Sequence, residues 1–257
     1  MVLVRQMSAG TRFGKVVVVA VMLAAGGSES GAQSAPLTAQ GLLNQMEATY
    51  AAAKTYADTS TARFRNPDQS EGAQVEFRIW FARPKFLRID ATTRATPEAA
   101  PLREVMWFDG ANARTWTTGS AVMTREKIQL AGSKMFGTYA YHIPTLLDES
   151  YAGPRRLNQL NSPALAADET IDGVDCYRVR GDWQGDPYDV WLGKADHLVR
   201  KIVADYKGYV MEETHREIAI NQPIAPAIFH FAPENEGGAG KKGTPPPRLP
   251  GEHVRPK

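Results

Sequence analysis

Hydrophobic and polar residues alternate along much of the chain in a way that predicts β-strands. The clearest case is 74–81, where Val75, Phe77, Ile79 and Phe81 fall on one side and mainly polar residues on the other. Because successive side chains of a strand point to opposite faces, these four residues are expected to share one face of a sheet. The same alternation flanks short Gly, Pro, Asp or Asn turns at 81–90, 107–116 and 188–202. The pattern predicts successive hairpins in one large antiparallel sheet.

The remaining periodicity predicts a few helices around this sheet. Apolar residues at spacings of three and four indicate a helix over 37–54, with Thr38 as its N-cap. Two shorter segments, 124–136 and 142–149, are further helix candidates, and 91–101 and the stretch between Pro154 and Pro163 are expected to be irregular. Strands are also expected at 55–64, 86–92, 104–108, 113–117, 175–181, 188–192, 198–205 and 210–220, with a short strand or staple at 228–231. The fold class is therefore mainly β (α+β).

The first 34 residues are expected to be a secretory signal peptide. Arg5, Arg12 and Lys15 precede an apolar run over 16–25, which is shorter than the ~20 residues that span a bilayer. The run is followed by small residues, and Ser34 marks the expected cleavage site. No Cys lies directly after the apolar run, where a lipid would be attached, so lipidation is not expected. We expect a periplasmic protein; the alternative is a short N-terminal anchor that stays uncut.

Charge and composition narrow the range of partners. The first 34 residues contain three basic residues and one acidic residue, so the remainder has 27 of each sign. A neutral chain argues against nucleic acid as a partner, because that interaction needs a basic face. The segment 234–257 is rich in Gly, Pro and Lys and is expected to be a disordered tail. The single cysteine, Cys176, lies on an expected strand and is interpreted as a buried, inert thiol.

No catalytic or metal-binding pattern stands out. The five histidines include no pair at a spacing of two or four, and no G-x-S-x-G or phosphate-binding glycine loop is present. His215 lies between Thr214 and Arg216 on an expected strand, which favours a surface residue over a catalytic base. The chain is therefore expected not to be an enzyme and to need no metal or other cofactor.

Seven residues on expected strands are candidates for the lining of an apolar cavity. The simpler interpretation of each aromatic among them is ordinary core packing. Together, the aromatics on expected strands are too many for the thin interior of a flat sheet, so we expect a strongly curved sheet around a hollow. The candidate lining residues are Val75, Phe77, Ile79, Phe81, Phe108, Trp116 and Trp191.

Several short segments, taken in order, resemble the periplasmic outer-membrane lipoprotein carrier superfamily, which includes LolA, LolB and LolA-like domains of unknown function. They are RPKFLR at 83–88, FDG at 108–110, IDGVDCYRV at 171–179 and DVWLGK at 189–194. The resemblance implies an unclosed antiparallel barrel of about eleven strands with helices plugging its open side, here over 35–233. It also implies an arginine on an early strand that tethers the lid, for which Arg63 and Arg65 are candidates.

The function that this resemblance implies is the binding and carriage of a lipid or of the acyl chain of a lipoprotein. An inner- or outer-membrane protein is a possible further partner, and the chain is expected to be a monomer. The alternative is a periplasmic regulatory or protein-interaction module that uses the same fold without a lipid. An enzyme is the third and weakest interpretation.

Overall fold

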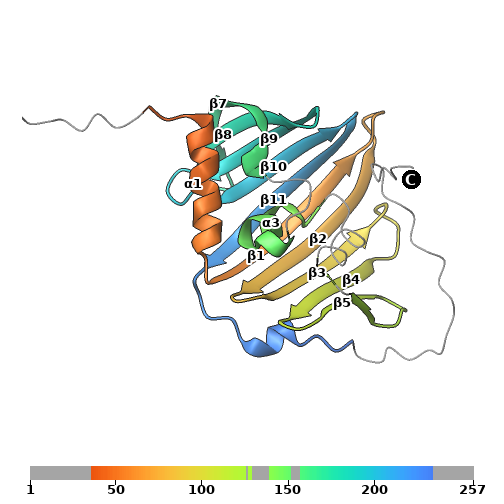
Figure 1. Ribbon diagram of the computed structural model, residues 1–257. Coiled ribbons are helices and arrows are strands. Elements are labelled where there is room, and N and C mark those ends of the chain that lie inside the picture. Colours follow the sequence, from red (N-terminus) through yellow and green to blue (C-terminus); the bar gives the residue numbers. More distant parts are fainter. Residues whose placement is uncertain (1–35, 126, 129–138, 152–156, 234–257) are drawn as a thin grey trace, which may run out of the picture. The chain divides into compact units, whose positions relative to one another are not determined.

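The alternating segments pair into a single antiparallel sheet in the computed structural model of the chain (Figure 1). The structure describes residues 36–125, 127–128, 139–151 and 157–233. From Leu37 onward these residues belong to one compact unit, which is described by itself. The expected signal peptide (1–34) and C-terminal tail (234–257) lie outside the described residues.

The sheet has eleven strands and is open. Its order is β6-β5-β4-β3-β2-β1-β11-β10-β9-β8-β7, so that β6 and β7 form two separate edges instead of closing a barrel. The prediction of a mainly β fold built on an unclosed antiparallel sheet is confirmed. The strands are β1 (Thr55–Arg65), β2 (Glu71–Ala82), β3 (Phe86–Arg94), β4 (Leu102–Asp109), β5 (Ala113–Thr117), β6 (Met123–Arg125), β7 (Asn161–Ile171), β8 (Val174–Trp183), β9 (Asp186–Gly193), β10 (Val199–Tyr206) and β11 (Tyr209–Ile220).

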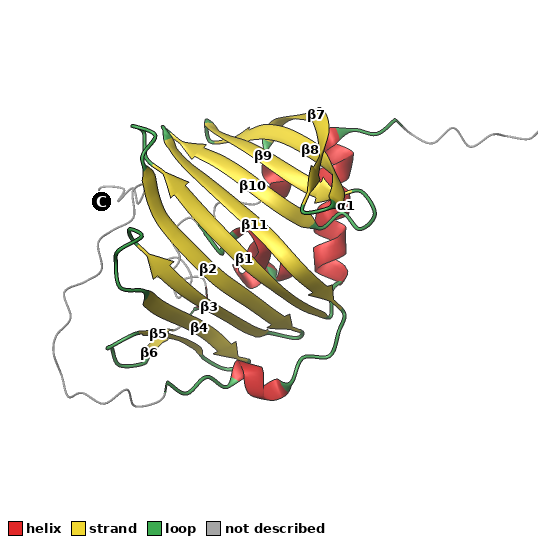
Figure 2. Cartoon of the chain, turned by 180° about the vertical axis from the view of Figure 1, so that it is seen from behind, coloured by secondary structure: helices red, strands yellow, loops and turns green. Residues whose placement is uncertain are grey.

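Two described α-helices lie on the same face of this sheet, as the views from the two sides show (Figures 1 and 2). Helix α1 (Ala39–Ala52) begins at Thr38, whose hydroxyl oxygen accepts a hydrogen bond from the amide of Gly41 at 3.0 Å, as predicted for an N-cap. Helix α3 (His142–Leu147) has only six residues. The described residues also form three short 3₁₀ turns: η1 (Glu149–Tyr151), η2 (Leu157–Gln159) and η3 (Pro226–Phe229).

Several expected boundaries were wrong. Thr124 lies on edge strand β6 and does not cap a helix; residues 126 and 129–138 of that expected helix lie outside the described residues. Strand β7 already begins at Asn161, because its Pro163 is tolerated on an edge strand that pairs only with β8. The segment expected as a short strand at 228–231 contributes instead to the 3₁₀ turn η3.

The two faces of the sheet differ in what covers them. We call the face that carries Phe77 and Ile79 the inner face; it joins α1 and α3 in the main hydrophobic core. The opposite, outer face has a smaller cluster in which Trp107 and Trp116 pack against Phe231, next to η3. The chain after β11 therefore crosses the outer face while the helices cover the inner face.

Candidate functional site

The inner face of β2, β3 and β4 is a continuous apolar surface. The four predicted residues of β2, Val75, Phe77, Ile79 and Phe81, are each no more than 2% exposed. Their cross-strand neighbours continue the surface, since Ile79 pairs with Ile89 and Ile89 pairs with Met106. Neighbouring apolar side chains on one face of a sheet pack directly together. The alternation in 74–81 therefore correctly predicted which side chains of β2 share a face.

The structure separates the other predicted lining residues. Phe108 pairs with Leu87, which pairs with Phe81, so Phe108 lies on the inner face and packs, half-buried, on the core. Trp116 pairs with Val105 and lies in the outer-face cluster. Trp191 also lies on the outer face, where it pairs with Arg178 and Lys201. Both cations lie over its ring in cation–π contacts. Five of the seven residues thus lie together, and Trp116 and Trp191 lie apart from them.

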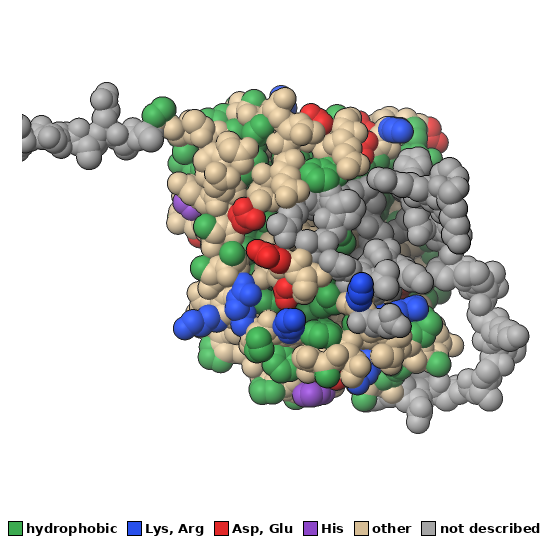
Figure 3. Space-filling view, viewed as in Figure 1, with side chains coloured by type: hydrophobic (Ala, Val, Ile, Leu, Met, Phe, Trp, Pro, Cys, Tyr) green, Lys and Arg blue, Asp and Glu red, His purple; other side chains and the backbone are tan. Residues whose placement is uncertain are grey.

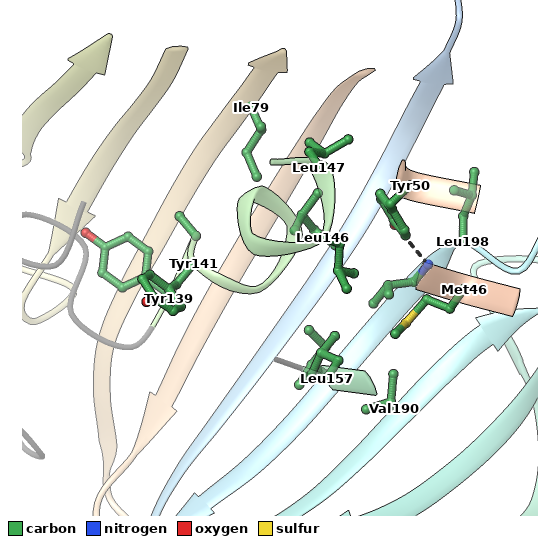
Figure 4. Close-up of a cluster of buried hydrophobic side chains, with 14 of the residues drawn as sticks. Met46, Tyr50, Ile79, Tyr139, Tyr141, Leu146, Leu147, Leu157, Val190 and Leu198 are labelled. Atoms are coloured by element: carbon green, nitrogen blue, oxygen red, sulfur yellow. Dashed lines mark hydrogen bonds between the residues drawn. The ribbon is translucent and has the colours of Figure 1, made fainter. Parts of the chain in front are cut away.

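Helices α1 and α3 join this apolar surface in the main hydrophobic core. Apolar residues of α1, including Met46 and Tyr50, are fully buried, and all six residues of α3 are buried. Figure 4 shows Leu146 and Leu147 of α3 close to Ile79 of β2 and to Tyr50 of α1. The phenol of Tyr50 also accepts a hydrogen bond from the amide of Val199 at 3.1 Å, which ties α1 to the start of β10.

Arg83 links both helices to the end of β2. Its guanidinium donates to the carbonyl oxygens of Ala51 (2.6 Å) and Ala53 (3.0 Å) at the end of α1 and to that of Leu147 (2.9 Å) at the end of α3. It also lies over the ring of Phe81. Cations are favourable at helix C-termini, where carbonyl groups lack partners within the helix. The space-filling view shows Lys and Arg side chains in a band below α3 (Figure 3).

Arg63 and Arg65, the two arginines considered for the tether of a lid, lie on β1 and are both exposed. Arg83, which follows β2 at the hairpin turn, reaches the ends of both described α-helices. The sequence places several arginines in the first two strands and the turn after them, and only the folded chain brings Arg83 to two helix ends.

A fully buried ionic network connects α3 to the middle of the sheet. On β1, the Asp58 carboxylate accepts hydrogen bonds from Tyr56 (2.8 Å) and Ser60 (2.9 Å), and it also accepts one from the Ile79 amide (3.2 Å). His215 Nδ1 lies 2.8 Å from the same carboxylate. The expectation that His215 is a surface residue was therefore wrong, because β11 lies in the centre of the sheet and its inner side is covered.

The network continues through Glu213 to the first residue of α3. Glu213 lies 3.2 Å from His215 Nε2 and 2.9 Å from His142 Nδ1, and all three side chains are fully buried. Despite burial, the two carboxylates raise the pKa of His215 to about 9, and the two histidines lower that of Glu213 to about 2. His215 therefore stabilises the fold below pH 6.5 and loses this contribution as the pH rises through 9. Glu213 stabilises it above pH 4.5 and loses this contribution as the pH falls through 2.

This network has the residue types of a hydrolase site but not the required arrangement. Both ring nitrogens of His215 face carboxylates, so the protonated ring has no lone pair with which to accept a proton from Ser60. The Ser60 side chain is also buried. Each carboxylate of the network faces an imidazole ring. We therefore interpret the network as a structural element that supports the fold.

A second polar cluster lies on the inner face of β4 and β5. Glu104 of β4 is 8% exposed, and burial raises its pKa to about 7. The hydroxyl of Tyr139 lies 3.4 Å from it, and the hydroxyl of Thr115 on β5 is buried with no hydrogen-bond partner among the described residues. No sequence pattern indicated this cluster, because a polar residue at an inward position of a strand looks the same in the sequence as one at a solvent-facing position.

Other predicted features are placed as follows. Cys176 is buried, as predicted, and burial raises the pKa of its thiol. No group of three or more His, Cys, Asp or Glu side chains in the described parts of the chain is arranged to hold a metal ion. None of the described helices has the length and apolar character needed to cross a membrane.

Comparison with known proteins finds similarity at the level of the fold. No protein-family model and no curated protein matches the sequence. The chain is similar to solved structures of LprF from Mycobacterium bovis (14% identity, 73% of this chain and 94% of that one, TM-score 0.46) and of lipoprotein LppX from Mycobacterium tuberculosis (13%, 73% and 97%, 0.45). It is also similar to a LolA superfamily protein from Nitrosomonas europaea (12%, 76% and 98%, 0.35). The open antiparallel sheet of eleven strands, with the described helices over one face, agrees with the architecture that the sequence resemblance implies.

Proposed function

We propose that this protein binds an apolar ligand, such as the acyl chain of a lipid or lipoprotein, between the inner face of its sheet and its helices. After export to the periplasm, it would carry or sense this ligand. The observation that carries the proposal is the contrast between a broad apolar surface and the small size of the described helix near it. The apolar residues of β2–β4 lie on the same side as α3, a helix of only six residues.

The lining proposed for the ligand is Val75, Phe77, Ile79, Phe81 and Phe108, all on the inner face. Each methylene group moved from water to such a surface gains ~0.8 kcal/mol. A fourteen-carbon chain would gain ~11 kcal/mol before the losses from immobilisation and from moving the helices are subtracted. Apolar contact alone is therefore sufficient for affinity.

Helix α3 is the element proposed to move when a ligand binds. Isolated helices of this length are unstable in water, so α3 depends on its tertiary contacts. Its two ends are held by polar contacts, from His142 to Glu213 at the start and from Leu147 to Arg83 at the end. A movement of α3 would have to break these two contacts and its apolar packing, but no hydrogen bond of the sheet.

The direct test is analysis of the full-length protein purified from periplasm. Native mass spectrometry and lipid extraction should find a co-purified lipid, and Phe77→Asp should abolish its retention, because a charge on the lining is unfavourable. Val210→Asp, at a half-buried outward position of β11, is a control for the effect of an added charge. The proposal would be refuted if the purified protein never contains a lipid and does not bind an apolar fluorescent probe.

The edge strand β7 favours the alternative, a protein-interaction module. It pairs only with β8, most of its residues are exposed, and Leu165 is 45% exposed. An open strand edge can pair with an extended segment of another protein. This alternative would be supported if the chain never retains lipid but forms a stable complex with a protein partner. The complex should be lost in Ala166→Pro.

A further inference from the structure

One carboxyl group on the inner face is not balanced by a cation. Glu104 pairs with Ala91, which pairs with Phe77, so its side chain projects on the same side as the proposed lining. Its one hydrogen bond within the described part of the chain comes from Tyr139 at 3.4 Å, a long distance for an O–H donor. No ion pair joins it to any described Lys, Arg or His.

An unpartnered hydroxyl lies close to this carboxyl. Thr115 is 1% exposed, and its hydroxyl oxygen is buried without a partner among the described residues. Thr115 pairs with Met106, two residues along β4 from Glu104, so the two side chains are diagonal neighbours on one face. The hydroxyl of Tyr139 lies 3.3 Å from that of Thr93 on β3. Buried polar groups are nearly always hydrogen-bonded, so an open hydroxyl beside an unbalanced carboxyl needs an explanation.

We propose that Glu104 and Thr115, with Tyr139 beside them, bind the uncharged, hydroxyl-bearing head of a lipid whose acyl chain lies on the apolar surface of β2–β4. A hydroxyl group of such a head donates to the Glu104 carboxyl and accepts from Thr115. An anionic head would meet a carboxyl with no described cation to offset the repulsion. This inference rests on the proposed function and adds the chemical class of the ligand, an acylglycerol or long-chain alcohol.

The protonation of Glu104 makes this selectivity dependent on pH. Because burial raises its pKa to about 7, the carboxyl is mostly neutral at pH 6 and mostly ionised at pH 8. In either form it can hydrogen-bond with a hydroxyl group. A carboxylate ligand can accept a hydrogen bond from it only at the lower pH and is repelled at the higher pH.

The experiment compares three ligands with the same fourteen-carbon chain: tetradecanol, monomyristoylglycerol and myristate. Each displaces an apolar fluorescent probe from the full-length protein at pH 6 and pH 8. We expect the wild type to bind myristate about tenfold more weakly at pH 8 than at pH 6, with little change for the other two. In Glu104→Gln the pH dependence should disappear. Thr115→Val should weaken the binding of tetradecanol and monomyristoylglycerol severalfold and leave the affinity for the probe unchanged.

Glu76→Gln is the matched control, because it makes the same change at an exposed position of the neighbouring sheet region. Equal affinities for all three ligands at both pH values, or a pH dependence that persists in Glu104→Gln, would overturn this inference and leave the proposed function intact. Failure of the wild type to bind the probe and all three ligands would overturn both. If Glu104→Gln does not fold, Thr115→Val and the wild-type pH comparison still decide the matter.

Discussion

The inner face has two polar regions that differ in how their charges are matched. In the ionic network, Glu213 lies between two histidines, and Asp58 accepts hydrogen bonds from three neighbouring groups in addition to facing His215. In the cluster around Glu104, a buried carboxyl has a single long hydrogen bond among the described residues, from Tyr139. Burial of a charge is tolerated when partners replace the lost water. Within the described residues, only the first region provides ion-pair partners, although His142 Nε2, Glu213 Oε1 and His215 Nε2 have no hydrogen-bond partner there. The matched region is therefore interpreted as structural and the unmatched region as a site for a ligand.

The largest expected effect is loss of the central carboxylate of the ionic network. Glu213→Leu leaves His142 and His215 without their shared partner and should lower the free energy of unfolding by ~3–5 kcal/mol. Glu212→Leu on the same strand is the control, because Glu212 pairs with Lys201 at a partly exposed position and should lose only ~0–1 kcal/mol. Urea unfolding measures both. Equal effects would show that the network does not stabilise the fold.

The next effect concerns the unmatched carboxyl. The folded state holds the proton of Glu104 up to about pH 7, whereas the unfolded chain releases it near pH 4.5, so this group destabilises the fold as the pH rises through that interval. Glu104→Gln removes the penalty. Its free energy of unfolding relative to wild type should therefore rise by about 2–3 kcal/mol between pH 4.5 and pH 8. A difference that does not vary with pH would mean that Glu104 is matched in the folded protein.

A smaller effect is expected at the tether that holds the cover over both regions. Arg83→Met removes three hydrogen bonds to helix ends but keeps an apolar stem, and should reduce stability by about 2 kcal/mol. Native-state hydrogen exchange should speed up in α3 more than in β8 and β9. Lys85→Met, at an exposed position in the same turn, is the control. Unchanged exchange in α3 would argue against the role of Arg83 as its tether.

The smallest effects compare two buried hydroxyl groups. Ser60→Ala removes a hydroxyl that is hydrogen-bonded to Asp58 and should reduce stability by about 1 kcal/mol. Thr115→Val replaces an unpartnered hydroxyl with a methyl group and should leave stability unchanged or raise it by up to about 1 kcal/mol. Thermal unfolding of both variants gives the comparison. Destabilisation by Thr115→Val would show that this hydroxyl has a partner.

Local pattern was sufficient for much of the fold. The period of two in β2 and the helical spacing in α1 both correspond to elements at the expected places, because each element buries one face against the rest of the molecule. The edge strands were harder to predict. Strand β7 is exposed on most of its length and β6 has only three residues, so neither shows the contrast between buried and exposed positions on which such predictions depend.

The candidate site was predictable only within single strands. Alternation placed Val75, Phe77, Ile79 and Phe81 together, but it could not relate the faces of strands that are distant in sequence, and so Trp116 and Trp191 were grouped with them although they lie on the outer face. The sequence resemblance correctly implied the fold. It did not reveal that Arg83, and neither Arg63 nor Arg65, reaches the helix ends.

Hairpins of alternating strands and an N-terminal helix follow from the amino-acid sequence, since these features depend on residues close together along the chain. Which polar residues are buried, and which of them find partners, depends on how distant strands pair. Asp58 and His215 are more than 150 positions apart and meet because β1 pairs with β11 in the centre of the sheet. Burial and charge matching are properties of such distant pairings, and no local pattern of polar and apolar residues encodes them.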